Sequence, residues 1–306
     1  MSAEEQQHST WRFLLGFIVP NLLAIALIGL TVLITKGSGD YIFAEFVIIP
    51  MLMGMVSAWF WRYGESSKTL RPLHLFINCI IGALLSAIFL KEGYICLLIA
   101  SPLALGFMAI GSYSARKLLE YRNNTLNVSV MILLMFIFIA DARSNHTYEN
   151  EVSDEIIINA PPEKVWPNVV AFKPIKQENK YWLFKIGMPS PMATTVTGYR
   201  NGAGRKCIFS NGYIFDEKIV DFEPNHKLTF DIIDQPRDPE IMGHIDIERG
   251  QFLLRDNGNG TTTLIGNSWY KLYVFPVWYY DIWAQSITRN VHFRVMKHIK
   301  EISEKN

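Results

Sequence analysis

The sequence has few cysteines, almost no net charge and none of the common catalytic signatures. Its three cysteines, Cys79, Cys96 and Cys207, are spread over 306 residues, which argues against a disulfide framework. The formal net charge of +1 gives no overall bias toward nucleic acid or an acidic partner. A G-x-S-x-G motif, a Walker loop and a dinucleotide-binding glycine pattern are all absent from the sequence. We therefore expect no cofactor and no nucleic-acid partner.

Hydrophobic residues make up 50% of the chain and are concentrated before about residue 142. A membrane-spanning helix needs roughly 20 apolar residues, and the last of the long apolar runs, at about 17, is at the lower limit. The runs are about Trp11–Thr35, Tyr41–Trp61, Pro72–Leu90, Gly93–Tyr113 and Leu126–Ala142. We expect an integral, multi-pass membrane protein in which residues 1–145 form an all-α transmembrane bundle of about five helices.

Basic residues are concentrated in two loops between these runs, at 62–71 and 114–125. The loops contain Arg62, Lys68, Arg71, Arg116, Lys117 and Arg122. The positive-inside rule places both loops in the cytoplasm. With five spans the C-terminal domain is then non-cytoplasmic, in what we expect to be a bacterial inner (cell) membrane. If the fifth run does not cross, that domain is cytoplasmic.

Few polar residues lie within the apolar runs. Glu45 and His74 lie near the starts of two runs, whereas Asn21 and Asn78 lie inside runs. Intramembrane asparagines are more often contacts between helices than transport sites. The sequence therefore favours a structural anchor over a transporter.

The second half reads as strands followed by a helix. Strands are expected at about Asp154–Asn159, Thr194–Tyr199, Arg205–Ser210, Tyr213–Phe222, Lys227–Ile233, Gly243–Arg255 and Thr261–Val274, mostly joined by tight turns such as Asn211-Gly212. From Pro276 to about Lys305, apolar residues recur every three or four positions. This spacing predicts an amphipathic helix roughly 40 Å long.

Four phrases in this half carry a family resemblance: EIIINAPPEKVWPNVVAF, GYIFDEKIVDFEPNHKLTFDI, GQFLLRDNGNGTTTLIGNSWYKL and VMKHIKEISE. Over about residues 152–303 the chain resembles the SRPBCC superfamily, the START-related and polyketide cyclase-like group with a helix-grip fold. The resemblance implies an α+β domain at 146–306, with an antiparallel sheet of about seven strands wrapped on the long C-terminal helix. It also implies an internal apolar cavity, but it identifies no catalytic residue.

Aromatic residues crowd the last strand and the start of the final helix. We expect the ligand-binding residues to be Trp182, Phe184, Trp269, Tyr270, Tyr279, Trp283 and His292. The same rings are also consistent with core packing or with docking on a membrane surface. His292 and His298 on the final helix have the chemistry of a general acid or base, although a helix-surface or capping role is favoured.

His244, Asp246 and Glu248 alternate along one predicted strand and share a face. Histidine and carboxylates on one face are able to bind a metal. The solvated face of a half-buried strand, with Ile245 and Ile247 pointing inward, explains the pattern better. We therefore expect no metal site.

The leading hypothesis is a membrane-anchored domain that binds a hydrophobic small molecule or lipid in an internal cavity. Its partners would be the lipid bilayer and this ligand. One alternative is a cyclase- or dehydratase-type enzyme that uses the same cavity. Another is a structural or sensory domain that binds a partner protein. An acid or base in the cavity with a shifted pKa would favour the enzyme.

Overall fold

The computed structural model describes residues 3–34, 43–63, 67–89, 91–121, 128–141, 143, 147–236 and 244–305. The ends of several expected segments, at residues 35, 41–42, 90, 126–127, 142 and 243, lie outside the described residues, as does Arg122. The chain divides into two compact units. The helical unit comprises Met1–His146 with Tyr273–Pro276, and the sheet unit comprises Thr147–Leu272 with Val277–Asn306.

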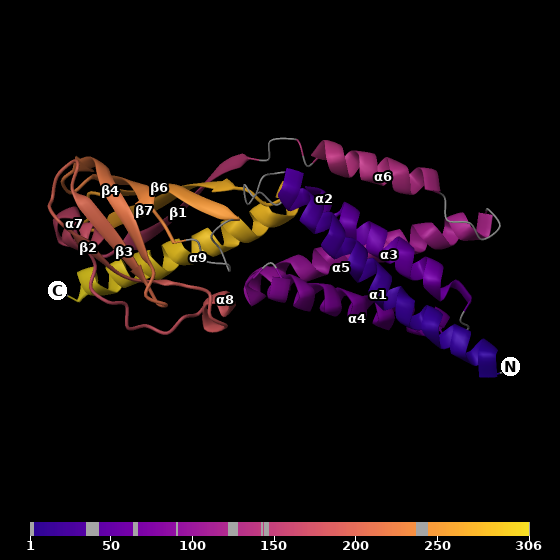
Figure 1. Cartoon of the computed structure of the whole chain (residues 1–306). Coiled ribbons are helices and arrows are strands. Elements are labelled where there is room, and N and C mark those ends of the chain that lie inside the picture. The colour runs from indigo at the N-terminus through magenta and orange to yellow at the C-terminus, as the bar shows by residue number, and fades with distance from the viewer. Residues whose placement is uncertain are drawn as a thin grey trace. The chain divides into compact units, whose positions relative to one another are not determined.

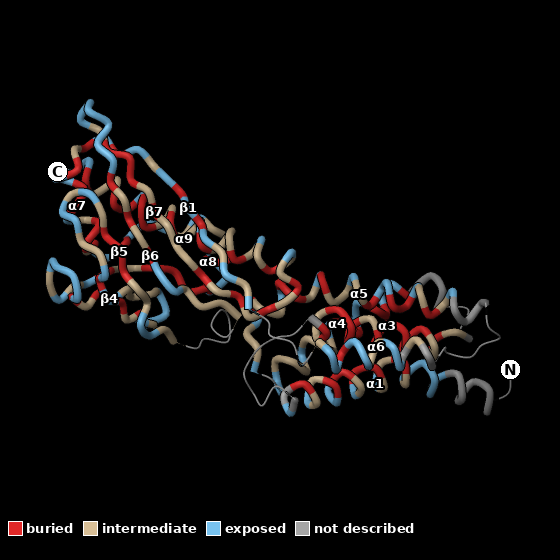
Figure 2. Tube along the Cα trace, turned by 90° about the horizontal axis from the view of Figure 1, so that it is seen from above, coloured by how far each residue is buried: buried red, intermediate tan, exposed pale blue. Residues whose placement is uncertain are grey.

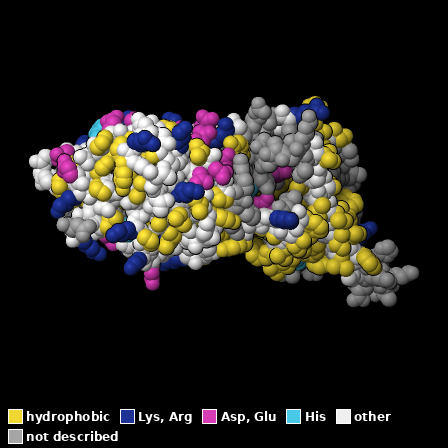
Figure 3. Space-filling view, turned by 60° about the vertical axis from the view of Figure 1, so that its left-hand side comes forward, with side chains coloured by type: hydrophobic (Ala, Val, Ile, Leu, Met, Phe, Trp, Pro, Cys, Tyr) yellow, Lys and Arg dark blue, Asp and Glu magenta, His cyan; other side chains and the backbone are white. Residues whose placement is uncertain are grey.

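The helical unit contains α1 (Ala3–Ile34), α2 (Phe43–Phe46), α3 (Ile48–Phe60), the 3₁₀ turn η1 (Trp61–Tyr63), α4 (Ser67–Phe89), α5 (Tyr94–Tyr121) and α6 (Val128–Asp141). Three segments are long and apolar enough to cross a membrane: Thr10–Thr31, Arg71–Phe89 and Tyr94–Lys117. In Figure 3, hydrophobic side chains cover much of the visible surface of this unit. These three helices thus have the length and apolar composition expected of membrane-spanning helices.

The second and fifth apolar runs form shorter apolar helices, described over Ala44–Phe60 and Ile132–Asp141. The second run is divided at Val47 between α2 and α3. Pro50 has no amide hydrogen to donate to the carbonyl of Phe46, which accounts for a break at this point. Of the five expected spans, three therefore meet the length criterion, and the crossing of a membrane by any of the five stays a prediction.

Small and amide side chains hold the described helices of this unit together. A Cβ added at Gly54 would lie 2.0 Å from the carbonyl oxygen of Met108, so α3 and α5 approach backbone to backbone. Asn21 Nδ2 donates to Asn78 Oδ1 at 2.5 Å. Asn78 Nδ2 donates to Ser57 Oγ at 2.9 Å. Asn21 and Asn78 therefore bond helix to helix, as the sequence favoured.

The sheet unit contains a seven-stranded antiparallel sheet in the order β1-β7-β6-β5-β4-β3-β2. The strands are β1 (Tyr148–Ile158), β2 (Pro191–Val196), β3 (Gly204–Phe209), β4 (Ile214–Glu223), β5 (Lys227–Asp234), β6 (Ile245–Asp256) and β7 (Thr262–Leu272). Buried and exposed positions alternate along much of these strands (Figure 2). The sequence prediction of a seven-stranded antiparallel sheet is confirmed.

Three helices accompany the sheet: α7 (Pro162–Val170), α8 (Trp182–Lys185) and α9 (Val277–Glu304). The long α9 runs along one face of the sheet (Figure 1). Its C-terminal part packs into the main core through Val295, Met296 and Ile299, together with apolar residues of α7 and of several strands. The long C-terminal helix packed on the sheet is thus also confirmed.

Candidate functional site

Aromatic side chains from α8 and the first half of α9 lie together at one end of the helix. The rings of Trp182 and Trp283 meet edge to face, with centroids 6.3 Å apart. The ring of Tyr181 contacts that of Phe184 at 5.2 Å, and its hydroxyl lies 3.0 Å from Ser286 Oγ. Trp182 is 44% exposed, whereas Phe184 is buried. The result is an aromatic cluster that is open to the surface on one side.

Tyr279 adjoins the same aromatic cluster from the first turns of α9. Its ring contacts that of Tyr280 at 5.2 Å. Burial raises the pKa of Tyr279 above its ordinary value, and a side-chain hydrogen bond with Trp283 opposes the shift. Four of the expected ligand-binding residues, namely Trp182, Phe184, Tyr279 and Trp283, therefore belong to this cluster.

Tyr270 occupies a different position, fully buried on β7. Its hydroxyl donates to Asp281 Oδ1 at 2.5 Å, and Asn150 Nδ2 donates to both oxygens of Asp281 at 3.1 Å. Burial and then the bond with Asp281 raise the pKa of Tyr270 well above its ordinary range. Tyr270 therefore joins β7 to α9. Trp269, the preceding residue of the same strand, lies on the opposite face of the sheet from Tyr270.

His292 lies on the face of α9 that contacts the sheet and is 4% exposed. Its Nε2 is 2.8 Å from Ser268 Oγ on β7. Its Nδ1 is 2.9 Å from Asp154 Oδ2 on β1. Burial lowers the pKa of His292, while the bond with Asp154 and the Asp154 charge oppose the shift. The helix-surface role favoured from the sequence is wrong for His292, because three-dimensional packing turns this face of α9 toward the sheet.

Asp154 and Ser268 are not among the site residues predicted from the sequence. In β1 the positions Val152, Asp154 and Ile158 are all buried, so an acid stands where the strand pattern calls for an apolar residue. An inward-facing carboxylate needs a partner, because burying an unpaired charge is costly. That break in the alternation was the available signal. The partner itself was hidden, because His292 follows Asp154 by 138 positions.

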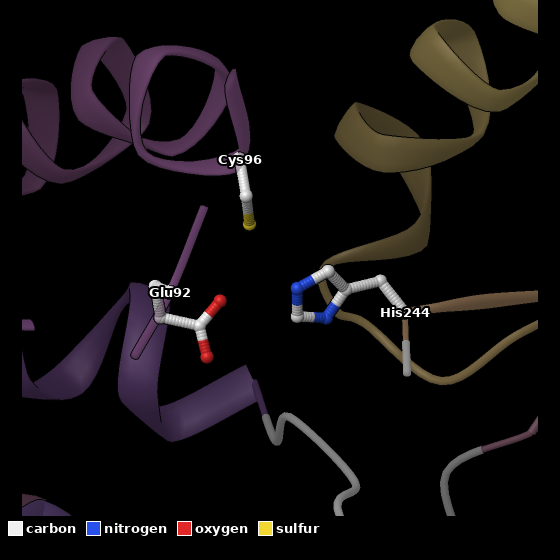
Figure 4. Close-up of side chains that lie close together, drawn as sticks. All are labelled: Glu92, Cys96 and His244. Carbon is white, nitrogen blue, oxygen red and sulfur yellow. The ribbon is translucent and has the colours of Figure 1, made fainter. Parts of the chain in front are cut away.

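The regular strand alternation expected for His244, Asp246 and Glu248 is interrupted, because His244 precedes β6 and the register shifts between Ile247 and Arg249. Ile245 and Ile247 pack on the buried group of Tyr270, as expected of inward-facing residues of β6. Figure 4 draws His244 beside Glu92 and Cys96. Glu92 and Cys96 belong to the helical unit and His244 to the sheet unit, whose relative positions are not determined, so no site is assigned to them.

The helical unit also contains a cavity of about 150 Å³ that the sequence did not predict. It is lined mainly by apolar side chains of α1, α3, α4 and α5, with Glu45 and Glu92 as the acidic residues of its lining. A space of this size and lining suits a short apolar group.

No protein-family model and no curated protein matches the sequence. Solved structures similar to the chain include norcoclaurine synthase from Thalictrum flavum, with 11% identity, a TM-score of 0.37, and coverage of 54% of this chain and 99% of that one. An aromatase/cyclase from Streptomyces sp. R1128 has 11% identity and a TM-score of 0.37, covering 52% of this chain and 95% of its own. A protein from Nitrosospira multiformis has 14% identity and a TM-score of 0.34, with coverage of 50% of this chain and 94% of that one. These similarities are too low to transfer an activity.

Proposed function

We propose that the chain is a membrane-anchored protein whose sheet unit binds a hydrophobic small molecule or lipid. The observation that carries this proposal is the aromatic cluster of Tyr181, Trp182, Phe184, Tyr279 and Trp283, which is partly open to the surface. Aromatic rings offer large apolar contact areas to a flat or aliphatic ligand. The three membrane-length helices support the anchoring.

Exposed apolar side chains close to the cluster along α8 and α9 support an entry route for such a ligand. Trp278 and Ile282 on α9 are 61% and 66% exposed, and Ile186 after α8 is 39% exposed. Large exposed apolar patches mark binding surfaces more often than scattered single residues do. A bilayer concentrates apolar ligands, so an anchored domain meets them more often than a free one.

The test is a titration of the full chain in nanodiscs with a fluorescent lipid. Trp283→Ala removes a ring that faces Trp182, so affinity for the lipid should fall. Val295→Ala is the matched control, because Val295 lies in the C-terminal part of α9 and belongs to the main core. It should cost about 1–3 kcal/mol of stability from lost buried methyls and leave the affinity of the folded protein unchanged. Wild-type affinity in Trp283→Ala would contradict the binding role of the cluster.

A second candidate function is an enzyme that works on the same apolar ligand. His292 favours it, because this buried base has a lowered pKa and hydrogen-bonding partners on both ring nitrogens. Perturbed titratable groups of this kind are frequent at catalytic sites, although structural networks also produce them. In a cyclase or dehydratase, His292 would act as the general base and no side chain would need to act as a nucleophile.

A further inference from the structure

The side chains of Ser268, His292 and Asp154 are connected in space from hydroxyl to imidazole to carboxylate. Ser268 Oγ lies 2.8 Å from His292 Nε2, and His292 Nδ1 lies 2.9 Å from Asp154 Oδ2. The three residues come from β7, α9 and β1. Both distances fall within the range for a nucleophile bonded to its base and a base bonded to the group that orients it.

The register of the sheet holds two members of this triad in place. Asp154 pairs with Gly266 and Val152 pairs with Ser268, so Asp154 and Ser268 are diagonal neighbours on the face toward α9. Gly266 leaves room for the helix: a Cβ there would lie 3.2 Å from Met296 Sδ and 3.8 Å from His292 Cγ. The imidazole therefore lies over a strand position that has no side chain.

Hydrogen bonding and burial set the tautomer and charge of the imidazole. The Asp154 carboxylate can only accept a hydrogen bond, so Nδ1–H donates to it and the Nε2 lone pair is directed at the Ser268 hydroxyl. Burial lowers the pKa of His292, so the imidazole is neutral and able to act as a base at pH 7. Asp154 and His292 are 8% and 4% exposed, whereas Ser268 is only partly buried. Ser268 is thus the least buried residue of the three, and the base and carboxylate are shielded.

We propose that Ser268 is the nucleophile of an acyl-ester hydrolase, with His292 as general base and Asp154 as its positioning residue. The class of substrate, an apolar acyl ester, rests on the proposed function. Ser268 Oγ forms a bond to the ester carbonyl carbon while its proton moves to His292 Nε2. The carbon–alkoxide bond then breaks and the leaving alcohol takes that proton. Water attacks the acyl-serine in the same way, with its proton passing through His292, which releases the acid and restores Ser268.

The experiment uses the full chain in nanodiscs, a tagged fluorophosphonate and p-nitrophenyl decanoate. We expect the fluorophosphonate to label wild type on the peptide that contains Ser268, and wild type to release p-nitrophenol. Ser268→Ala should lose the label, and His292→Gln should lower ester hydrolysis by about 10²–10⁴-fold. Ser303→Ala is the matched control. Ser303 lies on α9 like His292 but far along the helix, where its Oγ accepts a hydrogen bond from Asn168 Nδ2. It should be labelled and active like wild type.

The positioning role of Asp154 has its own readout. The charges that act on His292 in the described part of the chain come from Asp154 on β1 and Arg289 on α9. Asp154→Asn removes the charge that favours the protonated imidazole, so the lower inflection of the kcat/KM profile should move to lower pH while kcat falls. An unchanged inflection with a lower melting temperature alone would overturn the positioning role.

The binding and hydrolysis proposals fail separately. Wild type that binds the fluorescent lipid but is neither labelled nor active on the ester would overturn the hydrolase and leave the binding function standing. Labelling at Ser268 and hydrolysis without lipid binding would support the triad and overturn the proposed binding. Labelling that survives in Ser268→Ala, at another residue, would overturn the assignment of the nucleophile.

Discussion

A buried ion pair in the sheet unit permits a sharp test of how its interior is stabilised. Arg205 on β3 and Glu217 on β4 are direct partners in the sheet and are only 3% and 4% exposed. Their side chains form a salt bridge, and Arg205 Nε also donates to the carbonyl oxygen of Val170 at 3.2 Å. The guanidinium lies 4.4 Å from the centroid of the Phe230 ring. Arg205→Met would remove all of these contacts and leave the Glu217 carboxylate buried without its partner.

The expected loss for Arg205→Met at pH 7 is about 3–5 kcal/mol, the usual cost of breaking a buried ion pair. This is about a fifth or more of the roughly 5–15 kcal/mol that stabilises a typical domain. Burial already raises the pKa of Glu217, and Arg205 opposes that shift. Without Arg205 the carboxyl is easier to protonate, and a raised folded-state pKa means that stability is regained as pH falls. The loss should therefore be smaller at pH 5 than at pH 7.

The measurement is urea denaturation of a fragment spanning 147–306, followed by circular dichroism. The wild-type fragment should unfold cooperatively, because almost all of it belongs to one compact unit. The double variant Arg205→Met/Glu217→Leu removes both charges and should be within about 1 kcal/mol of wild type or more stable. If Arg205→Met unfolds at the wild-type urea concentration at pH 7, the pair is solvated in solution and the reasoning is refuted.

Two further predictions concern orientation and pH. A C-terminal reporter that is active only in the cytoplasm should be silent, because the basic loops place residues 146–306 on the non-cytoplasmic side when all five apolar runs cross; a bright reporter would contradict this orientation. Burial lowers the pKa of His292 from 6.5 in the folded state, so its contribution to stability is present above that pH and is lost as pH falls toward the folded-state value. The urea midpoint of the wild-type fragment should fall more steeply below pH 6.5 than that of His292→Gln, and equal slopes would exclude this linkage.

The strands were predictable because local signals agreed with the tertiary structure. Gly212 adopts a φ of +88°, as the Asn211-Gly212 hairpin signal requires. Two strands depart most from their predicted bounds. The strand expected at Thr194–Tyr199 is β2, at Pro191–Val196, and β1 begins at Tyr148 and not near Asp154. Glu149, Asn150 and Glu151 have the composition of a loop, but they pair with the last residues of β7, opposite Lys271, Tyr270 and Trp269. The neighbouring strand therefore overrides local preference here.

The site was only partly predictable, for a different reason. Composition pointed to the aromatic residues near the start of α9, and the rings of Trp182 and Trp283 do meet. Composition does not specify which face of a strand a residue occupies, and this depends on register. Trp269 and Tyr270 are adjacent and aromatic, yet they lie on opposite faces of the sheet.

The Arg205–Glu217 pair and the triad depend on different parts of the fold. The Arg205–Glu217 pair needs only the register between two neighbouring strands. The triad also needs a particular rotation of α9 about its own axis, because His292 comes from the helix and its partners come from the sheet. That rotation is fixed on one side by the bond from Tyr270 to Asp281, and on the other by Met296 and Ile299 in the core. His292 lies along α9 between these two anchors, so the packing on both sides of it holds its imidazole against Ser268 on the sheet.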